Sequence, residues 1–184
     1  MMNVSMNKEA RLSPHFTLGE LCKTSYHTLD GNIPSHVAIE NLKNLCENWL
    51  EDLRYSYNTL YGDGTQGTGP LCSANFAQTD QSPCAAAEKE EEMPLIITSG
   101  YRSEEVNRLC GGAKGSNHLT GCAVDIRCMG PEHQIRLASI LLDIADGSKR
   151  KFDELILEKR GSTRWIHFAV RPKDNRRKIL FDMR

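Results

Sequence analysis

The sequence predicts an α+β domain in which a small antiparallel sheet carries a metal site and helices flank the sheet. Short runs rich in β-branched and aromatic residues alternate with longer segments whose apolar residues recur at helical spacing. Three side chains that can bind a metal, His118, Asp125 and His167, lie in or beside the predicted strands. No internal repeat divides the 184 residues, and this length is typical of one domain. We therefore expect a single domain over residues 1–184.

Helices are predicted from capping residues and from apolar spacing. Thr17, with Glu20 three residues later, begins a short helix. A longer amphipathic helix is expected over 34–57, a serine-capped helix over 103–109 and another amphipathic helix over 130–145. The residues expected to face the core in the two long helices are Val37, Ile39, Leu42, Leu45, Cys46, Trp49, Leu50, Leu53, Ile135, Leu137, Ala138, Ile140, Leu141, Leu142 and Ile144.

Strands are predicted where short apolar runs are rich in β-branched or aromatic residues. The expected strands are 94–98, 122–128, 152–158 and 164–170, with a hairpin loop at 159–163.

Residues 58–92 differ in composition from the rest of the chain. They are rich in Gly, Thr, Gln, Ser and Ala and end in a glutamate-rich run. This composition predicts a flexible insertion between a helix and a strand. We favour a tolerated mobile loop, and a lid over a substrate groove is the alternative.

The spacing of His118 and Asp125 indicates a turn between them. Seven residues span about 10 Å in a helix and about 23 Å in a strand, whereas zinc holds its nitrogen and oxygen ligands at about 2.0 to 2.2 Å. Gly121 lies where a turn is needed. Asp125 then falls on the strand 122–128, and His167 is expected on a neighbouring strand.

A carboxylate for proton transfer is predicted on the strand 152–158. Strand alternation places Glu154, Ile156 and Glu158 on one face. We choose Glu158 as the general base, because a carboxylate at the end of this strand can take a proton from zinc-bound water.

These residues form a pattern that resembles a known family. Residues 99–103 read Ser-Gly-Tyr-Arg-Ser, residues 116–125 fit Ser-x-His-x-x-Gly-x-Ala-x-Asp, and residues 165–167 fit Trp-x-His. The pattern resembles the zinc D-alanyl-D-alanine peptidases, a family of carboxypeptidases and phage endolysins that cut peptidoglycan stem peptides. It is most similar to the carboxypeptidase-type branch, and the resemblance covers most of the chain outside 58–92.

The resemblance implies a role for each matching residue. It makes His118, Asp125 and His167 the ligands of Zn²⁺, with a fourth position left for water. It makes Arg102 a catalytic residue that also binds substrate near the scissile bond, and Ser116 a polar neighbour of the substrate. The implied fold is that of hedgehog domains and D-alanyl-D-alanine peptidases.

The chain departs from several relatives at one position. They carry an acidic catalytic base three residues before the last histidine, where this chain has Arg164. Other members, and the metal site of hedgehog signalling domains, have a glutamate on the preceding strand, where Glu158 falls.

The expected function is zinc-dependent hydrolysis of peptidoglycan stem peptides, by a carboxypeptidase or by an endolysin-type endopeptidase. The alternative, which Arg164 keeps open, is a catalytically inactive, zinc-stabilised binding module of the same fold. Taken singly, His167 could be a core histidine, Asp125 a strand-end cap and Arg102 a surface ion pair. Their order and spacing together favour the metal site.

Composition limits the partners and the location. The formal net charge is −1 and the pI is about 6.6. The composition therefore indicates no basic field that would attract nucleic acid or an anionic membrane. We expect a monomer whose partner is a peptidoglycan peptide. With no signal peptide or membrane span recognised, we expect synthesis in the cytoplasm and access to the wall after lysis or through a holin.

Seven cysteines, an odd number, occur without a Cys-x-x-Cys pair. Several lie in apolar surroundings, so reduced core thiols are expected. A bond between Cys72 and Cys84 is the alternative, and no cysteine has the histidine partner of a nucleophile.

Overall fold

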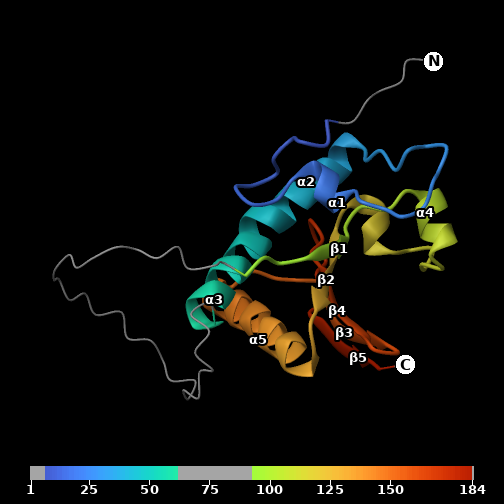
Figure 1. Cartoon of the computed structure of the whole chain (residues 1–184). Coiled ribbons are helices and arrows are strands. Elements are labelled where there is room, and N and C mark those ends of the chain that lie inside the picture. The colour runs from blue at the N-terminus through green and yellow to red at the C-terminus, as the bar shows by residue number, and fades with distance from the viewer. Residues whose placement is uncertain (1–6, 62–92, 184) are drawn as a thin grey trace, which may run out of the picture.

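The computed structural model describes residues 7–61 and 93–183 (Figure 1). Within these residues, five strands form one sheet in the order β1-β2-β4-β3-β5. The strands are β1 (Ile97–Ser99), β2 (Ala123–Cys128), β3 (Glu154–Arg160), β4 (Thr163–Ala169) and β5 (Lys178–Asp182). The helices are α1 (Leu18–Leu21), α2 (His36–Leu45), the π-helix η1 (Cys46–Leu50), α3 (Glu51–Tyr61), α4 (Glu104–Leu109), the 3₁₀ helix η2 (Asn117–Thr120) and α5 (Pro131–Ser148). This mixed architecture agrees with the expected α+β class.

The sequence predicts an antiparallel sheet, but the sheet is mixed. β1, β2, β4 and β3 pair antiparallel in turn, but β5 pairs parallel with β3. The reason lies in the segment after β4, which returns to the start of β3. There the N–H of Arg177 donates to the carbonyl of Phe152, and the N–H of Lys178 donates to that of Asp153. β5 therefore begins beside the first residues of β3 and runs in the same direction.

The two faces of the sheet have different surroundings. α5 packs against β2, β3 and β4, and α3 packs against α5. Figure 1 shows α2 and α3 following each other along one rod, with α5 beside the end of α3. Trp49 of this rod lies 5.0 Å from Phe168 and 6.3 Å from Phe152 between ring centroids. These contacts close the apolar core on the helical face and leave the other face for polar side chains.

The long N-terminal helix differs from its prediction at its ends and in its middle. It extends to Tyr61, so residues 58–61, expected in the insertion, are helical. The π-turn at 46–50 adds a residue to one turn, and Cys46, Trp49 and Leu50 are all buried there. Val37, expected to face the core, is 67% exposed. The rest of the insertion, 62–92, lies outside the described residues.

Other predicted boundaries shift by a few residues. Helix α5 continues to Ser148, and Ile135, expected to be buried, is 60% exposed. Residues 94–96 precede β1, and β3 begins at Glu154, two residues later than predicted. The hairpin loop is only Gly161-Ser162, because β3 extends to Arg160 and Gly161 takes a left-handed conformation with φ of 61°. Within residues 7–61 and 93–183, no helix is both long and apolar enough to cross a bilayer.

Candidate metal centre

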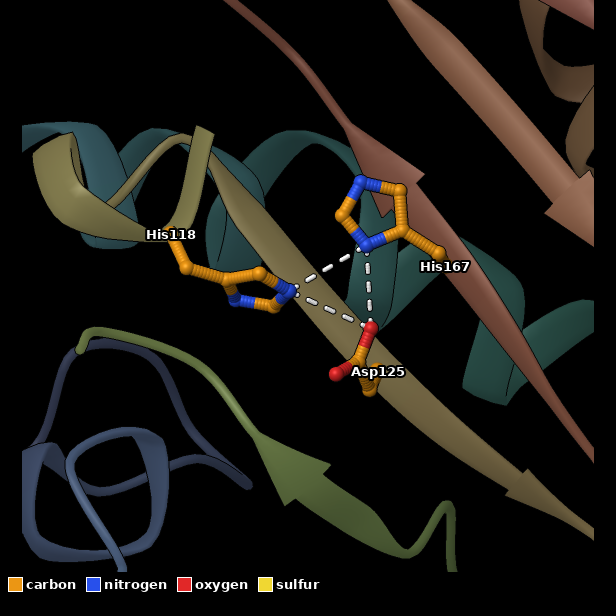
Figure 2. Close-up of side chains that lie close together, drawn as sticks. All are labelled: His118, Asp125 and His167. Atoms are coloured by element: carbon orange, nitrogen blue, oxygen red, sulfur yellow. Dashed lines mark hydrogen bonds and ion pairs between the residues drawn. The ribbon is translucent and has the colours of Figure 1, made fainter. Parts of the chain in front are cut away.

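The polar face of the sheet brings together the three predicted ligands (Figure 2). His118 lies on η2, Asp125 on β2 and His167 on β4. Asp125 and His167 are direct partners in the β2–β4 ladder, so their side chains emerge side by side. The predicted turn is confirmed, since Gly121 ends η2 with φ of 69° and sends the chain into β2.

The donor atoms have the spacing of a tetrahedral site. Asp125 Oδ1 lies 3.2 Å from His118 Nε2 and 3.0 Å from His167 Nδ1, and the two nitrogens are 3.2 Å apart. Ligands held by a tetrahedral ion at about 2.0 to 2.1 Å would be about 3.3 Å from one another. All three residues are buried, with no more than 8% of their surface exposed. Among the described residues they form the group that could hold a metal ion, and His, Asp and His suit zinc.

His118 is fixed by a contact behind the centre. Its Nδ1 lies 2.6 Å from the carbonyl oxygen of Gly100. Because a carbonyl only accepts, Nδ1 must carry the proton, and the lone pair of Nε2 faces Asp125 and His167. Burial lowers the pKa of His118, which favours this neutral form. A side chain at Gly100 would come within 2.2 Å of the Leu21 carbonyl oxygen. The close packing of residue 100 against Leu21 therefore requires glycine.

His167 is oriented by carboxylates at both of its ring nitrogens. Nδ1 faces Asp125, and Nε2 lies 3.7 Å from Glu154 Oε2. Burial would lower the pKa of His167, but the hydrogen bonds that its ring donates to both carboxylates raise it to about 9. His167 therefore holds a proton at neutral pH, and a metal ion bound at Nδ1 would take the place of a proton.

Glu154 was not predicted as a site residue. Its carboxylate accepts from Asn117 at 3.1 Å and lies 3.0 Å from Arg176 and 3.4 Å from Lys178. Its pKa falls to about 2, chiefly through His167. The sequence does place Glu154 on the same strand face as Glu158. Glu154 lies two residues before Ile156, which pairs with His167, and this strand register is the signal that could have identified it.

Arg102 contacts one of the three predicted ligands, Asp125, directly. Its guanidinium pairs with Asp125 Oδ2, and its Nε donates to Ser99 Oγ at 2.7 Å. Burial alone would raise the pKa of Asp125, but the hydrogen bond and the charge of the His167 ring hold it well below its usual range. Asp125 is therefore an ionised carboxylate that offers one oxygen to the metal position and the other to Arg102.

A pocket of about 600 Å³ opens over the three ligands. It is lined by Glu154, Ile156 and Glu158 on β3, which confirms that these side chains share a face. Glu158 pairs with Trp165, two residues before His167, and burial raises its pKa above the usual value. Among the three carboxylates that line this pocket, Glu158 is the one whose pKa is raised, whereas those of Asp125 and Glu154 are lowered.

Ser116 and Arg164 have different positions relative to this pocket. Ser116 lines it and is also the N-cap of η2, because its Oγ accepts from the N–H of His118. Its predicted contact with substrate stays a prediction. Arg164 does not line the pocket, because strand alternation turns it toward α5, where Nη1 donates to Gln134 at 3.2 Å. It therefore does not occupy the place of a catalytic base.

Within residues 7–61 and 93–183, the other histidines and cysteines do not belong to the group of three, although Cys110 lines the pocket. His15 pairs with Glu51 at 2.6 Å, and His133 packs against Tyr57. The described cysteines are free, and all but Cys110 are buried. Burial raises the pKa of Cys22 and of Cys128 to about 12, in keeping with core thiols. Cys72 and Cys84 lie outside the described residues.

Comparison with known proteins agrees with this geometry. A family model described as Peptidase M15 matches residues 55–169, which is more than half of the chain and includes the three ligands, Arg102 and Glu158. A search of curated proteins gave no match.

Proposed function

The chain belongs to the peptidase M15 family, and from that premise we propose that it is a zinc-dependent peptidase that hydrolyses peptidoglycan stem peptides. The family consists of metallopeptidases and is zinc-dependent in general. The observation that carries the proposal is the set of three buried donor atoms 3.0 to 3.2 Å apart at the base of an open pocket. The donor set fits zinc in residue type and in spacing.

His118, Asp125 and His167 would hold the ion, and their fixed orientation leaves the pocket side open to substrate. Bound zinc supplies Lewis acidity, which polarises a carbonyl and brings the pKa of a water molecule close to 7. The chain must then supply a proton acceptor for the attacking water and a hydrogen-bond donor to the substrate carbonyl oxygen, where negative charge develops.

Glu158 is the proposed proton acceptor. It lines the same pocket as the ligands, and its raised pKa makes it a better base than an exposed glutamate. Its carboxyl group takes the proton of the attacking water and returns it to the leaving amine, so the chain is unchanged after one turnover. Glu154 is a poorer candidate, because Arg176 and Lys178 hold its carboxylate and its pKa is about 2.

Arg102 is the proposed donor to the substrate. Two of its five N–H groups are used by Ser99 and Asp125. The guanidinium also lines the pocket, so a remaining N–H can donate to the substrate carbonyl oxygen as negative charge develops there. Ser116, on the same wall, is proposed as a further polar contact for the peptide.

The alternative of an inactive zinc-binding module loses its main support. It was kept open by Arg164, which stands where some relatives have their base. Arg164 faces α5, so the pocket keeps Glu158 as a base. We accordingly propose an active enzyme that acts as a monomer and reaches the wall after lysis or holin-type release.

Purified peptidoglycan and mass spectrometry of the products test the proposal. The zinc-loaded protein should release either one terminal alanine, as a carboxypeptidase, or longer stem-peptide fragments, as an endopeptidase. Glu158→Gln should lower kcat by about 10²- to 10⁴-fold while still binding one zinc ion. Arg164→Gln is the matched control and should keep kcat within a factor of three. A zinc-loaded protein that yields no product would overturn the proposal.

A further inference from the structure

Three arginines line the pocket, and two of them are already paired. Arg102 pairs with Asp125. Arg176 donates to both oxygens of Asp153 at 2.7 Å and lies 3.0 Å from Glu154. Arg160 is exposed and has no ion pair or side-chain hydrogen bond within the described part of the chain. Its guanidinium is therefore available to a ligand.

The position of Arg160 follows from the strand register. Ile156 pairs with His167, Glu158 with Trp165 and Arg160 with Thr163. Arg160 thus lies on the face that carries Glu158, two residues further from the metal ligands. Four residues of strand span about 13 Å, and an extended peptide rises about 3.3 Å per residue. A group held by Arg160 would lie about two to four residues from the bond at the metal centre.

The charge around the centre favours a cation at this place. Of the three carboxylates in the pocket, Asp125 and Glu154 are paired with arginines, so Glu158 is the one left to repel a substrate that is itself acidic. Arg102 and Arg176 are already engaged by carboxylates of the chain. Arg160 can offset the repulsion, and its planar fork matches a carboxylate in a bidentate manner.

A second part of the pocket wall comes from outside β3. It is built by the segment from Cys110 to Ser116. A side chain added at Gly111 or at Gly115 would meet no atom within 4 Å. These two glycines therefore leave open space beside this part of the wall.

We infer that Arg160 binds a carboxylate of the substrate peptide, about two to four residues from the scissile bond, and so selects acidic peptides. This inference rests on the proposed peptidase function. The carboxylate can come from the peptide's C-terminus or from an acidic side chain, and the two sources share one chemistry.

Three synthetic stem peptides test the inference on the zinc-loaded protein. The first has a free C-terminus and a free side-chain carboxylate, the second has the C-terminus amidated, and the third has the side chain amidated. Arg160→Gln should raise KM for the first peptide about 10- to 100-fold and leave kcat within a factor of three. The wild type should show the same rise in KM for one of the amidated peptides, which identifies the source. Arg160→Gln should show no further rise on that peptide.

Arg108→Gln is the matched control, since Arg108 is an exposed arginine outside the pocket, and its KM values should equal those of the wild type. Equal KM values for the wild type and Arg160→Gln on all three peptides would overturn the inference while leaving the peptidase intact. If the wild type cleaves none of them, the proposed function fails instead. The affinities of the wild type and of Arg160→Gln for the uncleaved peptides, measured by calorimetry, then test whether Arg160 binds the carboxylate. Equal affinities for the two proteins would overturn that role.

Discussion

At the scale of single residues, the metal centre depends on groups that do not touch the metal position. His118 is oriented by the Gly100 carbonyl and His167 by Glu154, so each imidazole presents one defined nitrogen. Glu154 is itself held by Asn117 and Arg176. Such outer contacts raise the basicity of a ligand and reduce the orientational freedom that it loses on binding.

Glu154→Gln should therefore weaken zinc binding by about 10- to 100-fold, because the amide is uncharged and interacts less strongly with Nε2 of His167. Competition with a chromophoric chelator measures the affinity, and a thermal melt of the metal-free protein shows whether the fold is kept. Lys178→Gln is the control, because Lys178 contacts the same carboxylate from an exposed position. Equal zinc affinities for Glu154→Gln and the wild type would contradict this role.

At this scale, the sequence can predict the candidate ligands but not the residues that support them. The proximity of His118, Asp125 and His167 can be predicted from residue type and spacing, because a turn and two paired strands are enough to bring them together. Glu154 depends on Arg176, which reaches it only after the chain has passed through the whole β3–β4 hairpin. No local pattern records such a contact.

At the scale of elements, the turn that ends η2 determines where His118 lies relative to Asp125. Gly121 has a left-handed conformation, and a side chain there would lie 2.4 Å from the Ala38 carbonyl oxygen. The turn therefore packs directly against α2, and Asn41 of that helix donates to the Thr120 carbonyl at 2.8 Å.

Gly121→Ala should lower the free energy of unfolding by about 2 to 4 kcal/mol, from the left-handed conformation and the close contact together. Gly147→Ala is a control of opposite sign. Gly147 lies within α5 with open space around it, so alanine should stabilise the protein by about 0.5 to 1 kcal/mol. Urea unfolding of both variants measures the difference. A Gly121→Ala protein as stable as the wild type would show that the turn tolerates a side chain.

Elements were predicted well in type and less well in extent. Thr17 and Ser103 cap α1 and α4 as expected, because capping is a local interaction. The π-turn at 46–50 and the strand β5 were not predicted. β5 has exposed apolar residues, including Phe181, without the one-sided burial that makes a strand visible in sequence. Its place beside β3 comes from long-range hydrogen bonds.

At the scale of the whole molecule, one buried carboxylate ties the C-terminal segment to the sheet. Asp153 is fully buried and accepts from Asn117 and from the guanidinium and backbone N–H of Arg176. Arg176 holds the pKa of Asp153 at about 2, against an ordinary value of 3.8. A lowered pKa in the folded state stabilises the protein above the ordinary value, and this stabilisation is lost as the pH falls toward 2.

Asp153→Asn should therefore lower the free energy of unfolding by about 2 kcal/mol at pH 7, and the loss should shrink between pH 4 and pH 2. Urea unfolding of the metal-free protein at several pH values measures this. Asp146→Asn is the control, since Asp146 pairs with Arg177 at the surface with 67% of its side chain exposed, and should change stability by less than about 1 kcal/mol. A loss that is the same at pH 3 and pH 7 would contradict the role of this ion pair.

Metal binding and folding are linked through the same molecule, because only the folded chain brings His118, Asp125 and His167 together. At a free zinc concentration 1,000 times the Kd, bound zinc should add about 4 kcal/mol to the free energy of unfolding, so a chelator should lower Tm by about 8 to 16 °C.

The pKa of His167 is about 9 without metal, so zinc must displace a proton at neutral pH. Zinc affinity should then rise about tenfold per pH unit between pH 6 and pH 8. Chelator-buffered titrations measure this slope, and Asp125→Ala, which removes the central ligand, should lose most of the zinc-dependent gain in Tm. An affinity that stays constant over this range would show that His167 is already neutral, and that Asp125 and Glu154 do not hold a proton on its ring.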